Sequence, residues 1–289
     1  MRLTTTTFIS LLAASPALAV PNVLTDIAPI NALVSEVMGD LGTPALLLPP
    51  NTDGHDYTMR PSDAQAVSEA DVIIRVGDAL TPWMSEVLTN LAPDASVLTL
   101  LETEGWTSRQ VSEGGDVDHG GVDPHAWLDP QIASVWVVRI AEALTVADPE
   151  NATTYAQNAQ TVAADFARLS DTIAAELAAV STKNFLWPHD AYQYFAARFD
   201  LTGVGAIAQS DASDPGPARI AALRDLALSG NVDCVLLDTE INASWGHILT
   251  DGTAIPMATV DPIGAGIPLG RGFYRTLLTQ LSSTLANCR

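Results

Sequence analysis

The chain has 289 residues, of which 47% are hydrophobic, and 34 acidic against 13 basic side chains give it a formal net charge of −21 at pH 7. This length and apolar fraction suffice for a large core, which we expect to be divided between two domains or lobes. The strong negative charge argues against nucleic acid and against an anionic membrane surface as partners.

The first 19 residues are typical of a cleavable secretory signal. Arg2 is followed by a largely apolar run, 8–18, and Ala17-Leu18-Ala19 forms a small-residue cleavage site. The run is too short to span a bilayer, and no later segment reaches about 18 uninterrupted apolar residues. We therefore predict an exported, soluble monomer with no stable membrane insertion. A buried N-terminal strand is the alternative for residues 1–19.

The first half of the mature chain alternates short apolar runs with helical patterns. Strands are predicted at 23–26, 44–48, 72–76 and 96–101, and helices at 29–38 and 81–91. A polar loop, rich in glycine and aspartate, follows over 102–123. Asp129 and Pro130 then form a cap and a first position that suit a helix over 130–147.

The longest helical pattern starts after Asp148, where Pro149 again suits a first helical position. Neither proline nor glycine interrupts the chain from there to Pro188, and apolar residues recur every three or four positions. The pattern predicts a helix over 149–181, about 50 Å long, which is enough to run the length of a small domain.

The second half repeats the alternation of strands and helices predicted for the first. Strands are predicted at 185–188, 203–207, 232–237 and 257–260, and helices at 191–199, 217–229 and 272–286. We therefore predict an α/β fold of two lobes, each a four-stranded, mainly parallel sheet flanked by helices, joined by one long rigid helix. The expected divisions are a signal at 1–19, an N-terminal lobe at 20–148, a linking helix at 149–182 and a C-terminal lobe at 183–289.

Four potential metal ligands lie where predicted strands end. His55 and His125 occupy loops after the second and fourth strands, while His189 and Asp261 directly follow the first and last strands of the second lobe. Ligands of open α/β sheets bind beyond the carboxyl ends of strands, so the four side chains can converge if the lobes face each other. Three imidazoles and one carboxylate form a typical tetrahedral zinc shell. Taken singly, each histidine is more often a surface residue, or one with its hydrogen bonds already satisfied, than a metal ligand.

Three motifs carry a family resemblance that covers essentially the whole mature chain. They resemble the ligand loops of the zinc-binding proteins of ABC importers (ZnuA-type, cluster A-I solute-binding family). The motifs are Leu48-Pro49-Pro50-Asn51-Thr52-Asp53-Gly54-His55-Asp56-Tyr57 with Arg60-Pro61-Ser62-Asp63, then Asp123-Pro124-His125-Ala126-Trp127-Leu128-Asp129-Pro130, and His189-Asp190-Ala191-Tyr192-Gln193-Tyr194-Phe195.

The resemblance implies a periplasmic protein that captures Zn²⁺ between its lobes and delivers it to an ABC transporter permease. It implies His55, His125, His189 and Asp261 as the metal ligands. A metallochaperone that loads the protein is a further partner to consider. In manganese-binding relatives the third ligand is glutamate, so His189 favours zinc, with manganese as the alternative cargo.

The loop before the second motif departs from the family pattern. Many zinc-binding members carry a long histidine-rich loop there, whereas this chain has a short loop with one histidine, His119. We interpret His119 as a solvated loop residue, with an auxiliary ligand as the alternative. Glu240 ends a strand at the same sheet edge and is interpreted as a lobe contact or an outer partner of the ligands, with a direct ligand as the alternative. His247 is interpreted as structural.

The two cysteines are Cys234 and Cys288. An oxidising compartment favours one disulfide, closing a loop of about 54 residues, with two buried free thiols as the alternative. The pair also matches a disulfide found in some zinc-binding members of the family that the motifs resemble.

A zinc hydrolase is the alternative from another functional class. Three histidines with an open fourth position can activate water. However, Asp261 would close that position, and neither an HExxH helix nor a Ser-His-Asp arrangement is present. We therefore expect a binding protein and not an enzyme.

Overall fold

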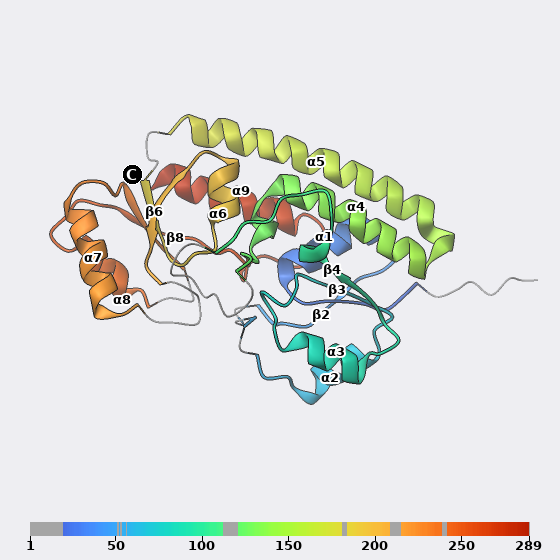
Figure 1. Cartoon of the computed structure of the whole chain (residues 1–289). Helices are drawn as coiled ribbons and strands as arrows, with labels where there is room; N and C mark the ends of the chain where they lie inside the picture. Colours follow the sequence, from blue (N-terminus) through green and yellow to red (C-terminus); the bar gives the residue numbers. More distant parts are fainter. Residues whose placement is uncertain are drawn as a thin grey trace, which may run out of the picture.

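The computed structural model describes residues 20–50, 52, 54–55, 57–111, 121–180, 184–208, 215–238 and 242–288. The predicted secretory signal and the side chains of Asp53, Asp56, His119 and Glu240 lie outside these ranges. Figure 1 shows two lobes with one long helix, α5, running along both of them. None of the helices within the described ranges has the length and apolar character needed to cross a membrane.

The N-terminal lobe is built on a parallel sheet in the order β2-β1-β3-β4, counted over the described residues. Its strands are β1 (Val23–Thr25), β2 (Ala45–Leu46), β3 (Val72–Arg75) and β4 (Ser96–Thr99). Its helices are α1 (Ala28–Met38), α2 (Pro61–Ser68), α3 (Met84–Leu91) and α4 (Pro130–Ala147). The inner strands β1 and β3 are buried on both faces, which explains their uninterrupted apolar runs.

Alternate residues of β3 pack into different clusters. Ile73 joins the cluster beneath α2 and α3 together with Met84, whereas Val72 and Ile74 face the main core. Successive side chains of a strand point to opposite faces of the sheet, so one short strand can pack against helices on both sides. This arrangement leaves the loops at the carboxyl ends of the strands to carry functional groups.

The C-terminal lobe repeats the design with a parallel sheet that, in the described part of the chain, has the order β6-β5-β7-β8. Its strands are β5 (Asn184–Trp187), β6 (Thr202–Ala206), β7 (Cys234–Leu237) and β8 (Met257–Thr259). Its helices are α6 (Gln193–Arg198), α7 (Pro217–Leu228), α8 (Ser244–Thr250) and α9 (Phe273–Asn287).

The long helix α5 (Ala152–Ala178) follows a short 3₁₀ turn at Pro149–Asn151 and unites the two lobes. Its buried face packs against α1 and α4 of the first lobe and against α9 of the second. As a result, the main core is continuous from the first lobe to the second: Trp136 of α4, Phe166 of α5 and Leu278 of α9 all belong to it. The two lobes therefore share a core and are not separate bodies on a flexible linker.

The predicted fold of two α/β lobes joined by a long helix is confirmed, and both sheets are wholly parallel over the described residues. Helices α2 and α8 were not predicted. Helix α2 has a local signal, because Pro61 occupies its first turn and Asp63 accepts the backbone N–H of Arg60. The sequence signal for helix α8 is weaker, because the helix contains Gly246, where a side chain would collide with Leu237.

The disulfide between Cys234 and Cys288 is present, as predicted. It joins the inner strand β7 to the residue that follows α9, and both cysteines are buried. The bond therefore fixes the end of the chain to the sheet of the second lobe.

Replacement of both cysteines by serine is expected to lower the free energy of unfolding by about 4 kcal/mol, because the bond closes a loop with a sequence separation of 54. Urea denaturation of the wild type and of the Cys234→Ser/Cys288→Ser variant under oxidising conditions measures this loss. A reductant should destabilise the wild type and leave the variant unchanged. Equal midpoints for the two oxidised proteins would contradict the prediction.

Candidate metal centre

Two of the predicted ligands, His125 and His189, meet at the seam between the lobes. His125 stands just before a 3₁₀ turn, Ala126–Leu128, that leads into α4, and His189 follows β5 after Pro188. Their ring centroids are 5.6 Å apart, and the residues are only 8% and 2% exposed. A tetrahedral zinc ion with bonds of about 2.0–2.1 Å to both rings would place the centroids about 5 Å apart. The spacing therefore suits two imidazoles that bind one ion.

Each of these imidazoles is oriented by a buried carboxylate. His125 Nδ1 lies 2.8 Å from Asp123 Oδ1, and His189 Nδ1 lies 2.9 Å from Asp238 Oδ2. A carboxylate partner on Nδ1 fixes the ring and its tautomer, which makes Nε2 the nitrogen that would coordinate a metal. Both histidines therefore have the carboxylate–imidazole arrangement that is common in metal sites.

The sequence did not single out these two orienting carboxylates. Asp123 is 0% exposed and Asp238 is 5% exposed. Asp123 stands two positions before His125 in the second motif, and Asp238 directly follows β7 at the same sheet edge as His189. The position of Asp123 and Asp238 near predicted ligands could have indicated an orienting role. Which histidine each carboxylate contacts depends on the tertiary fold.

Asp261 is held rigidly in the loop after β8. Its Oδ1 accepts the backbone N–H groups of Ile263 and Gly264 at 3.0 and 2.7 Å, and its Oδ2 accepts that of Ala265 at 2.7 Å. Each carboxylate oxygen has two lone pairs, so Oδ2 keeps one for a metal bond. Asp261 thus orders its own loop and retains the capacity to act as a ligand.

His55 is half-buried and follows a backbone segment that is anchored to the loop between β3 and α3. The indole N–H of Trp83 donates to the carbonyl of Gly54 at 2.9 Å. A side chain at Gly54 would meet Leu80 at 3.3 Å, so the two loops pack closely at this glycine. The anchor fixes the chain one residue before His55.

The structure does not gather all four predicted ligands into one shell. Considering only the side chains that it describes, no three of histidine, cysteine, aspartate or glutamate lie close enough together to hold a metal ion. His125 and His189 are brought together, while the participation of His55 and Asp261 stays a prediction. His247 is exposed on α8.

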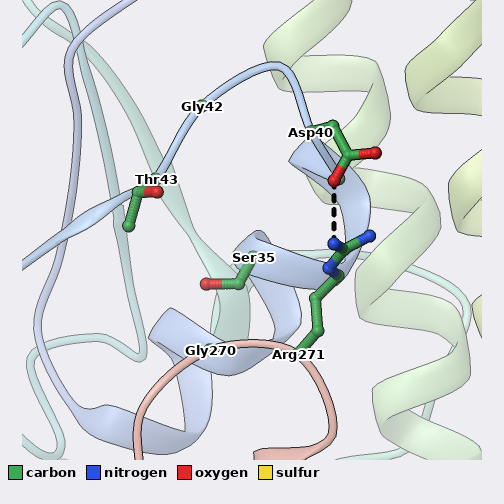
Figure 2. A pocket seen from close by; sticks show the side chains of 7 residues that line it. Ser35, Asp40, Gly42, Thr43, Gly270 and Arg271 are labelled. Carbon is green, nitrogen blue, oxygen red and sulfur yellow. Dashed lines mark hydrogen bonds and ion pairs between the residues drawn. The ribbon is translucent and has the colours of Figure 1, made fainter.

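Among the residues that the structure describes, two hollows lie between the lobes, and none of the predicted ligands lines them. One, of about 390 Å³, lies beside the start of α4 and is lined by Trp106, Arg109 and Arg198 among others. The other, of about 320 Å³, lies between the end of α1 and the loop before α9. Figure 2 shows Asp40 and Arg271 pointing toward each other across this second hollow, joined by an ion pair of 2.8 Å.

Known proteins resemble this chain over nearly its whole length. Residues 23–288 match the family described as "Zinc-uptake complex component A periplasmic" (ZnuA). The "High-affinity zinc uptake system protein ZnuA" of Paracoccus denitrificans is 36% identical, covering 96% of this chain and 94% of that protein. The protein of the same name from Brucella abortus is 30% identical, covering 92% and 91%.

Solved structures share the fold. A structure described as "Crystal structure of ZnuA" superposes with a TM-score of 0.80 at 22% identity and covers 93% of this chain and 99% of that one. The AdcAII protein of Streptococcus pneumoniae gives a TM-score of 0.77 at 26% identity, covering 91% and 98%.

A further buried carboxylate lies at the carboxyl ends of the strands of the first sheet, from which the His55 and His125 segments also extend. Asp26 follows β1, is 0% exposed and accepts the backbone N–H groups of Val76 and Ile27 at 2.6 and 2.8 Å. Burial raises its pKa to about 6, although these two bonds and the nearby positive charge of Arg75 act in the opposite direction. The ionised form of Asp26 therefore lowers the free energy of unfolding at neutral pH.

Because the pKa of Asp26 is higher in the folded chain than its ordinary value of 3.8, the folded state binds more protons between about pH 4 and pH 6. The free energy of unfolding should therefore fall by about 3 kcal/mol as the pH rises through this window, and this group should add no further change above it. Urea unfolding of the wild type and of Asp26→Asn from pH 4 to pH 8 isolates the effect. Parallel pH curves for the two proteins would show that Asp26 does not titrate in this way.

Proposed function

This chain belongs to the ZnuA family of periplasmic zinc-uptake components, and we therefore propose that it captures Zn²⁺ at the seam between its lobes and delivers it to an ABC transporter permease. The observation that carries the proposal is the meeting of His125 and His189, contributed by different lobes, each with a carboxylate on Nδ1. The family consists of solute-binding proteins for zinc uptake and not of enzymes. Export through the signal at 1–19 is part of the proposal.

In the proposed site His55 and Asp261 complete the shell around this pair. The anchored backbone before His55 and the rigidly held carboxylate of Asp261 support this assignment. The resulting three nitrogens and one oxygen favour zinc over manganese or calcium, which prefer oxygen-rich sites. The high negative charge of the chain also raises the local concentration of cations.

We propose that metal exchange proceeds by movement of ligand loops rather than by wide opening of the lobes. Buried hydrogen bonds cross the seam close to His125: Trp127 Nε1 donates to the carbonyl of Pro262 at 2.9 Å, and the hydroxyl of Tyr274 donates to the carbonyl of Trp127 at 2.6 Å. A wide opening would leave these groups unsatisfied and divide the shared core, at a cost of about 1–3 kcal/mol for each unsatisfied group.

His125→Ala is expected to weaken zinc binding by more than the roughly 100-fold that loss of an outer partner of a ligand can cost, because a direct metal bond is removed. His247→Ala is the matched control, since this histidine is exposed on α8. Competition titration of metal-free, untagged protein against a chromophoric zinc chelator gives affinity and stoichiometry. Unchanged values for His125→Ala would reject the assigned site.

Zinc is expected to displace manganese from the site at equal concentrations, because imidazole ligands bind zinc more strongly. Equilibrium dialysis against a mixture of Zn²⁺ and Mn²⁺, followed by metal analysis of the protein, measures the preference. Retention of manganese in the presence of equimolar zinc would favour the manganese-binding alternative.

A further inference from the structure

Helix α6 begins four residues after His189 and carries two side chains that reach the other lobe. Tyr194 and Arg198 are four positions apart, so they lie on the same face of the helix, one turn from each other. Because His189 is so near in sequence, the imidazole and these two side chains belong to one short structural unit of the second lobe. Their partners are the two ends of the segment that carries His125.

Tyr194 holds the first end of that segment. Its hydroxyl donates to the carbonyl of Asp123 at 3.1 Å and accepts the backbone N–H of Arg109 at 2.8 Å. The N–H of Asp123 in turn donates to the carbonyl of Arg109 at 2.9 Å, so the two chain segments are paired where the hydroxyl binds them. Burial raises the pKa of Tyr194 to about 12, and the hydroxyl would be a protonated donor at physiological pH even at its ordinary pKa of about 10.

Asp123 connects this contact of Tyr194 to His125. Its Oδ1 accepts the backbone N–H of His125 at 2.9 Å and lies 2.8 Å from the Nδ1 of the same residue. Any movement of the Asp123 backbone therefore shifts both the main chain and the ring of His125.

Arg198 holds the second end. Its guanidinium contacts both carboxylate oxygens of Asp129, with Nε at 2.8 Å from Oδ1 and Nη2 at 2.8 Å from Oδ2. Asp129 is buried and also accepts the N–H of Gln131, which caps α4. A two-point contact between guanidinium and carboxylate fixes orientation as well as distance, and lysine does not reproduce it.

We propose that Tyr194 and Arg198 are positioning residues that fix His125 relative to His189, and so set the zinc affinity of the site. The inference rests on the proposed function and adds to it two residues that bind no metal themselves. Two imidazoles on separate lobes meet at one ion only if the lobes keep a defined register. Helix α6 supplies that register next to the ligands by holding the chain on both sides of His125.

The chain offers a matched control for each residue. Tyr155 is equally buried and donates one hydrogen bond, to Asp148 at 2.8 Å, on the long helix α5. Arg271 forms a more exposed ion pair with Asp40 that also crosses the seam, but at the hollow of Figure 2, which no predicted ligand lines. These controls remove a buried hydroxyl and alter a pair between the lobes without touching the His125 segment.

The test measures zinc affinity by chelator competition for Tyr194→Phe, Arg198→Lys, Tyr155→Phe and Arg271→Lys, at a temperature where all four remain folded. Tyr194→Phe and Arg198→Lys should each raise the zinc dissociation constant about 10- to 100-fold while keeping one zinc per chain. The two control variants should bind as the wild type does. The absorption spectrum of bound Co²⁺ should change in the first pair and not in the second.

A double-mutant cycle separates positioning from general stabilisation. If Tyr194 acts through His125, Tyr194→Phe should have no further effect on zinc affinity in the His125→Ala background. Wild-type affinity in both α6 variants, or an equal effect of Tyr194→Phe in the two backgrounds, would overturn the inference and leave the proposed function intact. Absence of zinc binding by the wild type would instead refute the proposed function.

Discussion

Two buried histidine–aspartate pairs, His125 with Asp123 and His189 with Asp238, are the interaction on which the rest of the arrangement depends. Each pair is costly to bury, since a carboxylate away from water must be compensated. Each also belongs to a different lobe, so neither can complete a site alone. The fold must therefore bring two sheet edges together and hold them there.

The shared core explains how this requirement is met. Helix α5 packs against helices of both lobes, and Tyr274 and Trp127 bind across the seam within reach of the ligands. A two-lobed protein with a flexible linker would adjust the distance between its lobes on binding. Here packing sets the distance between the lobes, and preorganisation of this kind would lower the free-energy cost of binding at the proposed site. In the proposed site the same packing would restrict the movements by which an ion leaves.

Most of the fold was predictable because its signals are local. Buried parallel strands such as β3 are plain apolar runs, and α4 begins as predicted because Asp129 accepts the N–H of Gln131 and Pro130 occupies the first position. The positions of the candidate ligands followed from strand ends. The partners of those ligands did not, because the contacts of Tyr194 with Asp123 and of Arg198 with Asp129 join positions 71 and 69 residues apart. No periodicity or composition encodes a pairing at that distance.

The charges of the two pairs also bear on which ion suits the seam. In the proposed site Asp123 and Asp238 bring negative charge close to the ion without contacting it, and three neutral imidazoles and the carboxylate of Asp261 contact it. A dication there would have its charge balanced by these carboxylates, while three of its four direct bonds would be made to nitrogen. Calcium and magnesium require direct oxygen ligands and would leave this arrangement unused, whereas zinc accepts nitrogen readily. A shell of three nitrogens and one oxygen, backed by two outer carboxylates, would thus give selectivity for a nitrogen-preferring metal.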